Sequence, residues 1–233
     1  MDHLKLNLKS SNLQWKSLAH NDWGEILELS RKKAFQRKFQ IVEAFTTCVA
    51  EKGLQKVTHL DLAQRCGVTR QLVDHHFPTS NSLILLTYRY IYSRLQKQAA
   101  DAIMTRKSFV SRFKAYLESC ASWIEKHPAD VRFLIHFYAV APLDKELFNI
   151  HERNTKIGQE RLSALFRDAK AEGLLSNFDD LRLLDLASSV QQQLIGYMIL
   201  TSLRKSSPLA AKKAREDLFK TCLSILSIRA QSN

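Results

Sequence analysis

The sequence predicts an all-α protein, and three observations lead to this fold class. Apolar residues recur every three or four positions along most of the chain, which is the period of an amphipathic helix. No stretch of useful length shows the strict alternation that is typical of a half-buried strand. Only six glycines and four prolines interrupt 233 residues, so turns are few and helices are long. We expect about nine or ten helices and find no internal repeat.

The first strong helical signal begins near Arg31. Apolar residues recur at helical spacing between Phe35 and Val49, and Gly53 supplies a cap at the carboxy-terminal end. Residues 1–30 carry only a weak amphipathic pattern. For this segment the sequence leaves two alternatives open, a flexible lead or a helix packed on the body of the protein.

Two short helices follow, and a glycine joins them. Thr58 can cap a helix that runs to Cys66. Gly67 comes directly after it, where a tight turn needs a positive φ. The next helix is expected over about residues 69–76, and it ends before Pro78 because the residue ahead of a proline disfavours helical geometry.

Longer helices account for the rest of the chain. Their boundaries are set by proline, glycine and small polar residues, which start or stop helices for steric and hydrogen-bonding reasons. The expected ranges are 80 to about 97, 108–127, 129–140, 144–172, 179–205 and 208–228.

The charge and the apolar runs restrict the class of protein. Lysine and arginine outnumber the acidic residues by 35 to 23, a formal net charge of +12, which suggests a polyanionic partner. The longest apolar run, residues 194–200, is too short to span a bilayer, and the first residues lack the apolar stretch of a signal peptide. Four separated cysteines suit a reducing compartment. We expect a cytoplasmic protein with no membrane association.

Residues 54–78 contain what a helix-turn-helix requires, two short helices joined by a glycine turn. Ala63 is small where the two helices must approach each other, and Val73 faces back into their shared core. The second helix therefore turns its first residues outward. Among these, Arg70 can bridge guanine O6 and N7, and Gln71 can bridge adenine N6 and N7, in the major groove of DNA.

Five short motifs in and around this stretch resemble the amino-terminal domain of the TetR (tetracycline repressor) family of bacterial transcriptional regulators. The matching motifs are Ala50-Glu51-Lys52-Gly53, Val57-Thr58, Asp61-Leu62-Ala63, Cys66-Gly67-Val68-Thr69, and His75-His76-Phe77-Pro78 followed by Leu83. The remaining helices are similar to the family only in number, length and all-α character.

The resemblance implies a DNA-binding role for residues on both short helices. Thr58 would offer its hydroxyl and backbone amide to a phosphate, and His76 would approach the DNA backbone. The residues at the start of the second helix would face bases or nearby phosphates. The complete set of expected DNA-binding residues is Thr58, Thr69, Arg70, Gln71, Asp74, His75, His76, Arg37 and Lys38.

Two positions depart from the family's pattern. Asp74 stands where the family usually has a tyrosine, and Ser80 where it usually has a lysine that pairs with phosphate. A carboxylate at 74 repels phosphate, so it either turns away or accepts a hydrogen bond from a cytosine amine. We define the basic cluster as Arg31, Lys32, Lys33, Arg37 and Lys38. Either this cluster grips flanking phosphates and restores the lost charge, or it is a solvated helix face.

Two sets of residues in the carboxy-terminal part are candidates for further sites. Phe133, His136, Phe137 and Tyr138 would line a ligand pocket or pack in the core, and these roles are compatible. Leu186, Val190, Leu194, Tyr197, Cys222 and Ile225 would complete the core of one chain or pack on a second copy as a four-helix bundle. The family resemblance favours the dimer, because two recognition helices related by a twofold axis read a palindrome.

We therefore expect an amino-terminal extension (1–30), a helix-turn-helix DNA-binding domain (31–79) and a helical effector-binding and dimerisation domain (80–233). The expected function is a ligand-responsive regulator, by family analogy a repressor, that binds double-stranded DNA as a homodimer and responds to a small-molecule effector. No cofactor or metal is expected. The alternative is a helical interaction protein that keeps the fold with weak or non-specific DNA binding. An enzyme is not expected, because HExxH, GxSxG and phosphate-loop motifs are absent.

Overall fold

The computed structural model describes residues 23–203 and 208–231, and these ranges form ten α-helices, three 3-10 turns and no strand. The all-α prediction is confirmed for this part of the chain. In chain order the elements are α2 (Trp23–Arg31), η1 (Lys33–Phe35), α3 (Gln36–Lys52), η2 (Leu54–Lys56), α4 (His59–Cys66), α5 (Arg70–His76), α6 (Ser80–Met104), α7 (Phe109–Lys126), α8 (Pro128–Val140), η3 (Ala141–Leu143), α9 (Lys145–Ala171), α10 (Asp180–Leu203) and α11 (Pro208–Gln231).

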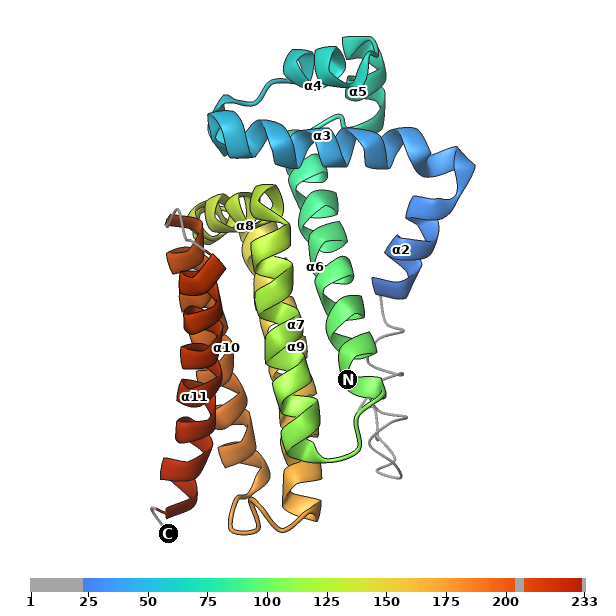
Figure 1. Cartoon of the computed structure of the whole chain (residues 1–233). Helices are drawn as coiled ribbons and strands as arrows, with labels where there is room; N and C mark the ends of the chain where they lie inside the picture. The colour runs from blue at the N-terminus through green and yellow to red at the C-terminus, as the bar shows by residue number, and fades with distance from the viewer. Residues whose placement is uncertain (1–22, 204–207, 232–233) are drawn as a thin grey trace.

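The helices form a small upper layer and a long lower bundle (Figure 1). α3 lies across the top of the bundle, and α4 and α5 sit on its outer side. α6 begins beneath α3 and runs down the length of the bundle, where α7, α9, α10 and α11 lie along it or beyond it. The α4–α5 pair is therefore the outermost part of the molecule at this end.

Most helices begin at the expected capping residues. Thr79, Ser108 and Asp144 each accept a hydrogen bond from the backbone amide of the residue three positions on, at the starts of α6, α7 and α9. The largest difference is the end of α6, which continues to Met104 instead of ending near residue 97. The expected end at Lys205 and the break at Ser206–Ser207 lie outside the described residues.

The segment before the helix-turn-helix contains a helix. α2 packs against α6, and Ile26 on α2 is buried. Because the apolar side of a short helix is stabilised mainly by tertiary packing, α2 depends on this contact. For residues 23–30 the structure thus favours the packed helix over the flexible lead, while residues 1–22 lie outside the described part of the chain.

The buried side chains form two clusters. The first joins the inner faces of α3, α4 and α5 to the upper part of α6 and to α8. In it, the Phe45 and Phe133 rings meet edge to face with centroids 5.8 Å apart. The second fills the lower bundle between α7, α9, α10 and α11. The first cluster crosses the expected domain boundary at residues 79 and 80, since Leu83 and Phe133 belong to it.

None of the described helices has the length and apolar character that crossing a membrane requires.

Candidate DNA-binding surface and ligand pocket

A reciprocal capping arrangement fixes the start of α4. The Thr58 hydroxyl oxygen accepts from the Asp61 backbone amide at 3.2 Å, and the Asp61 carboxylate accepts from the Thr58 amide at 2.9 Å. Lys52 at the end of α3 also donates to Asp61, at 2.5 Å. The Lys52 ammonium, followed by the Thr58 donors, lowers the pKa of Asp61 to about 2. One carboxylate thus ties α4 to the helix before it.

The turn between α4 and α5 has the geometry that the glycine predicts. Gly67 adopts a left-handed conformation with φ +64°, and its neighbour Val68 donates to the Ala63 carbonyl at 2.9 Å. Thr69 then caps α5 by accepting from the Leu72 amide at 3.3 Å. The expected helix-turn-helix geometry is present, and buried Val73 holds α5 on the core.

The expected DNA-binding residues lie together on the outer side of this motif. Thr58, Thr69, Arg70, Gln71 and His75 are all exposed. They come from the amino-terminal end of α4 and from the outer face of α5, the two helices at the extremity of the molecule in Figure 1. These hydrogen-bonding side chains are therefore accessible from the outer side of the motif, and readout of base edges requires such access.

Asp74 is engaged by its own chain. Its Oδ1 lies 2.6 Å from His59 Nδ1 on α4, and its Oδ2 lies 3.5 Å from Arg70 Nε, one turn earlier on α5. Of the two alternatives for this carboxylate, the structure favours the one in which it turns toward the protein. His59 was not among the expected site residues, because its contact with Asp74 depends on how the two helices cross.

His76 is half-buried below the exposed surface of α5. Burial, together with the charges of His75 and Lys38, lowers the pKa of His76. The imidazole is therefore uncharged at neutral pH and can offer a hydrogen bond but no positive charge to a DNA phosphate. Within the described residues, no three His, Cys, Asp or Glu side chains gather as a metal site requires.

The basic cluster lies around the start of α3, on the side where α4 ends, since Cys66 Sγ at the end of α4 lies 3.8 Å from the Gln40 carbonyl oxygen. Arg31 ends α2, Lys33 opens η1, and Arg37 and Lys38 belong to the first turn of α3. Arg37 is exposed and donates to Gln40 at 2.8 Å, while the Lys38 ammonium lies 5.3 Å from the centre of the Phe77 ring. Four of the five cationic side chains are exposed, and Lys38 is half-buried.

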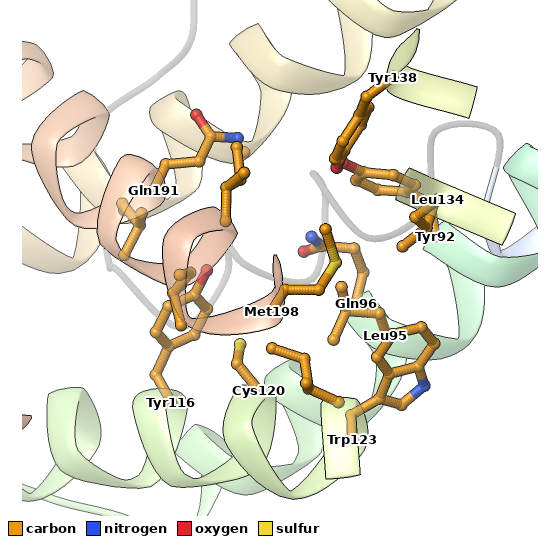
Figure 2. Close-up of a pocket in the computed structure, with 15 residues that line it drawn as sticks. Tyr92, Leu95, Gln96, Tyr116, Cys120, Trp123, Leu134, Tyr138, Gln191 and Met198 are labelled. Atoms are coloured by element: carbon orange, nitrogen blue, oxygen red, sulfur yellow. The ribbon is translucent and has the colours of Figure 1, made fainter. Parts of the chain in front are cut away.

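A cavity of about 70 Å³ lies in the bundle between α6, α7, α8, α9 and α10 (Figure 2). Aromatic and aliphatic side chains make up most of its lining. The lining residues are Tyr92, Leu95, Gln96, Tyr116, Cys120, Trp123, Ile124, Leu134, Tyr138, Gly158, Leu162, Gln191, Leu194, Ile195 and Met198.

Only one of the four expected pocket residues lines this cavity. Tyr138 does, and its hydroxyl lies 3.0 Å from that of Tyr92. Phe133 and Phe137 are fully buried in the upper core and do not line this cavity, so of the two expected roles the structure favours core packing for both. His136 lies on another side of α8, next to Gly53. Neighbours on a helix point about 100° apart, so consecutive residues of α8 cannot all face one cavity.

The six residues expected at a dimer interface form two groups that differ in burial. Leu186, Val190 and Cys222 are completely buried within the chain, so of the two expected roles the structure favours the core of one chain for these three. Leu194, Tyr197 and Ile225 are half-buried, and Leu194 lines the cavity.

The exposed apolar side chains of α10 and α11 are other residues than those expected at the dimer interface. Near the end of α10 and the start of α11, Leu200, Leu203 and Leu209 are 51%, 77% and 77% exposed. A methyl group at Gly196 on α10 would meet no atom of the chain within 4 Å. A methyl group at Gly158 on α9 would lie 3.0 Å from Nε2 at the end of the Gln191 side chain, so this glycine leaves room for the Gln191 amide between α9 and α10.

The fold and its exposed helix-turn-helix define an all-helical protein of the TetR-like architecture. No protein-family model matches the chain. Its sequence is 23% identical over 133 residues to the HTH-type transcriptional regulator BetI of Yersinia pestis, covering 56% of this chain and 67% of that protein.

Solved structures give the fold independently. A TetR transcription regulator from Haloarcula marismortui superimposes with a TM-score of 0.70 at 16% identity, over 83% of this chain and 97% of that one. A transcriptional regulator from Saccharomonospora viridis, solved in complex with choline, gives a TM-score of 0.65 at 16% identity, over 81% and 95%. The chain thus has the fold of TetR-family transcriptional regulators, which confirms the resemblance. The matched proteins are named as transcriptional regulators.

Proposed function

We propose that this chain is a DNA-binding transcriptional regulator that reads a palindromic operator as a homodimer and responds to a small-molecule effector. The observation that carries the proposal is the exposed start of α5, where Arg70 and Gln71 project from a helix that a capped turn holds rigidly. A short helix presented in this way fits the major groove, and these side-chain types are the ones that distinguish guanine and adenine.

The basic cluster supports the affinity of the same surface. Its cationic side chains lie next to the helix-turn-helix, and each contact they make with a phosphate would release counterions from the DNA. We infer that they supply the charge that Ser80 does not. Replacing all five residues with glutamine should weaken DNA binding and reduce its salt dependence. Unchanged affinity and salt dependence would leave the cluster as a solvated helix face.

The effector site of the proposal is the bundle cavity, and α6 supports its coupling to DNA. This helix contributes Leu83 to the core beneath the helix-turn-helix and Tyr92, Leu95 and Gln96 to the cavity. A ligand that binds two positions of α6 with different affinity shifts the separation of the recognition helices in a dimer. By analogy with the family, the regulator acts as a repressor, and it would work in the cytoplasm, where its DNA is.

Selection of bound sequences from a random DNA pool tests the proposed function. We expect the full-length protein to enrich a palindrome whose half-sites are separated by about one helical turn or a multiple of it. A gel shift with the protein's own upstream DNA, with and without cell extract, then tests the response to an effector. Enrichment of no sequence, with binding that depends on salt alone, would instead favour the alternative, a helical interaction protein with non-specific DNA binding.

A further inference from the structure

The cavity contains one side-chain amide whose orientation is fixed by a buried cation. Arg161 on α9 donates from Nη1 to Gln96 Oε1 on α6 at 2.5 Å. A guanidinium group has donors and no acceptor, so the amide atom that faces Arg161 must be the oxygen. The Gln96 Nε2, with its two hydrogens, is then the atom of this amide that remains to bind a ligand.

Arg161 also gives this end of the cavity a positive charge. Its side chain is 3% exposed, and burial lowers the pKa of Arg161 to about 10, so it remains protonated at neutral pH. The charge lies directly behind Gln96 and polarises its amide, which strengthens Nε2 as a donor. No lining residue is acidic, so nothing in the wall of the cavity offers a counter-charge to a bound cation.

The rest of the cavity suits a compact apolar body. Figure 2 shows Gln96 among the side chains of Leu95, Met198 and Trp123, with Tyr92 and Tyr138 at one side. The Tyr92 and Tyr138 hydroxyls are hydrogen-bonded to each other, and the Gln191 Nε2 donates to the Thr155 carbonyl at 3.5 Å. The donor that lies next to the buried guanidinium is therefore Gln96 Nε2, set in a mostly apolar wall.

We propose that this cavity binds a compact aliphatic monocarboxylic acid, whose carboxylate accepts from Gln96 in front of Arg161, and that it discriminates against quaternary ammonium compounds. A quaternary ammonium group can neither accept from Nε2 nor favour a site next to a buried guanidinium. This chain would therefore differ in ligand class from its structural neighbour that was solved with choline. The inference rests on the proposed effector site, and it names the chemistry of that site.

Three probes with nearly the same branched body test the proposal: 3,3-dimethylbutanoate, 3,3-dimethyl-1-butanol and choline. Calorimetric titration of the full-length protein measures each affinity. We expect the acid to bind best, the neutral alcohol less well, and choline at least about tenfold more weakly than the acid, as expected when one charge is reversed beside a buried cation. Choline binding as tightly as the acid, the alcohol binding best, or no binding of the acid would each overturn the proposal.

A pair of variants separates this chemistry from general effects of charge. Gln96→Glu keeps the size of the side chain but removes the Nε2 donor and neutralises Arg161, so the preference for the acid over choline should be lost. Gln193→Glu makes the same change on the exposed side of α10, outside the cavity, and should keep the preference. A Gln96→Glu protein that folds, with an unchanged circular dichroism spectrum, and still prefers the acid would contradict the assignment. Because these titrations contain no DNA, failure here leaves the DNA-selection result unaffected.

Discussion

At the scale of single residues, Asp74 links the recognition helix to the helix before it. A free carboxylate on the DNA-facing side would repel phosphate, but this one is shared between His59 and Arg70. We therefore expect the ion pair with Asp74 to favour one position of the Arg70 guanidinium in the protein without DNA. An arginine that is ordered in advance loses less conformational entropy when it makes the paired contacts to guanine.

The substitution Asp74→Asn should accordingly relax sequence selectivity at the base pair that Arg70 reads. We expect a loss of roughly tenfold in discrimination at that position, within the range of one paired base contact, and little change in the dependence of affinity on salt. Quantitative binding to operators that differ at single positions measures both effects. Asp101→Asn removes a comparable exposed pair, with Lys97 on α6, and should change neither. If Asp74→Asn raised affinity equally for every operator, Asp74 would act only by repelling phosphate.

Asp61 makes the stability of the helix-turn-helix dependent on pH in the acidic range. Its pKa falls from 3.8 to about 2 in the folded chain, because Lys52 and Thr58 donate to its carboxylate. A carboxyl group with a lowered pKa contributes its stability fully above the unfolded value and loses it as the pH falls through the folded value.

The difference in thermal stability between the wild type and Asp61→Asn should therefore be largest above about pH 4 and should shrink as the pH approaches 2. Thermal unfolding followed by circular dichroism across this pH range measures it. Glu118→Gln, at an exposed helix pair with Lys114, serves as the control and should show no comparable trend. A constant difference at all pH values would mean that Asp61 stabilises only through groups that do not titrate.

At the scale of elements, the turn between α4 and α5 requires glycine for its backbone conformation and not because a side chain would lack room. A methyl group at Gly67 would meet no atom within 4 Å, yet its φ is +64°. Gly67→Ala should therefore destabilise the protein by about 1 kcal/mol through left-handed strain alone.

Gly196→Ala is the matched control for that substitution. It adds the same methyl in open space, but within the helix α10, where alanine is favoured over glycine, so we expect stability to rise by up to about 1 kcal/mol. Chemical denaturation of both variants gives the two values. Equal changes of the same sign would show that backbone conformation is not the cause.

The helix boundaries were largely predictable because their signals are local. Thr58, Thr79 and Ser108 each cap a helix through an amide three residues away, so neighbouring sequence contains both partners. The predicted end of α6 near residue 97 is too early. Residues 98–104 contain no proline or glycine, so nothing in the sequence stops the helix there. Helical periodicity correctly places Val190 on an apolar face of α10. It does not say which neighbour covers that face, and here the neighbour belongs to the same chain.

The site was predictable only where it is local in sequence. The exposure of Thr69, Arg70 and Gln71 was predictable because one capped turn presents all three, and their contact with DNA stays a prediction. The cavity was not found, since it is assembled from five helices and its walls are set by their packing. The interaction of Gln96 with Arg161 joins residues 65 positions apart, and no motif spans such a distance.

At the scale of the whole molecule, one continuous core joins the DNA-facing helices to the bundle. Phe45 of α3 packs on Phe133 of α8, and Leu83 of α6 belongs to the same cluster. Close-packed interiors transmit displacements because their side chains cannot be compressed. A movement of α6 at Gln96 is therefore expected to reach the helix-turn-helix through this core. The predicted division at residues 79 and 80 is therefore not a boundary in packing.

The surface of α10 and α11 limits how two copies of the chain, and so two recognition helices, could pair. The buried Leu186 and Val190 cannot form a dimer contact without unfolding α10, whereas Leu200, Leu203 and Leu209 already expose apolar surface at one end of the α10–α11 pair. Burying such side chains against a second copy removes apolar surface from water, and the surface is self-complementary about a twofold axis if the same residues meet. We infer that the proposed homodimer would form through this end of the pair.

The double substitution Leu200→Glu with Leu203→Glu should therefore convert the protein to a monomer, because it places four like charges in the twofold contact. Sedimentation measures the change in mass. Affinity for a palindromic operator should fall by at least about tenfold, while affinity for a single half-site stays nearly constant, because only the palindrome requires two recognition helices at once. Leu143→Glu introduces the same type of charge at a leucine that is 83% exposed in η3, and it should leave both mass and affinity unchanged. A double variant that remains dimeric, with its fold intact, would move the contact to another face of the bundle, and the half-site spacing of the operator would then have to be explained from that face.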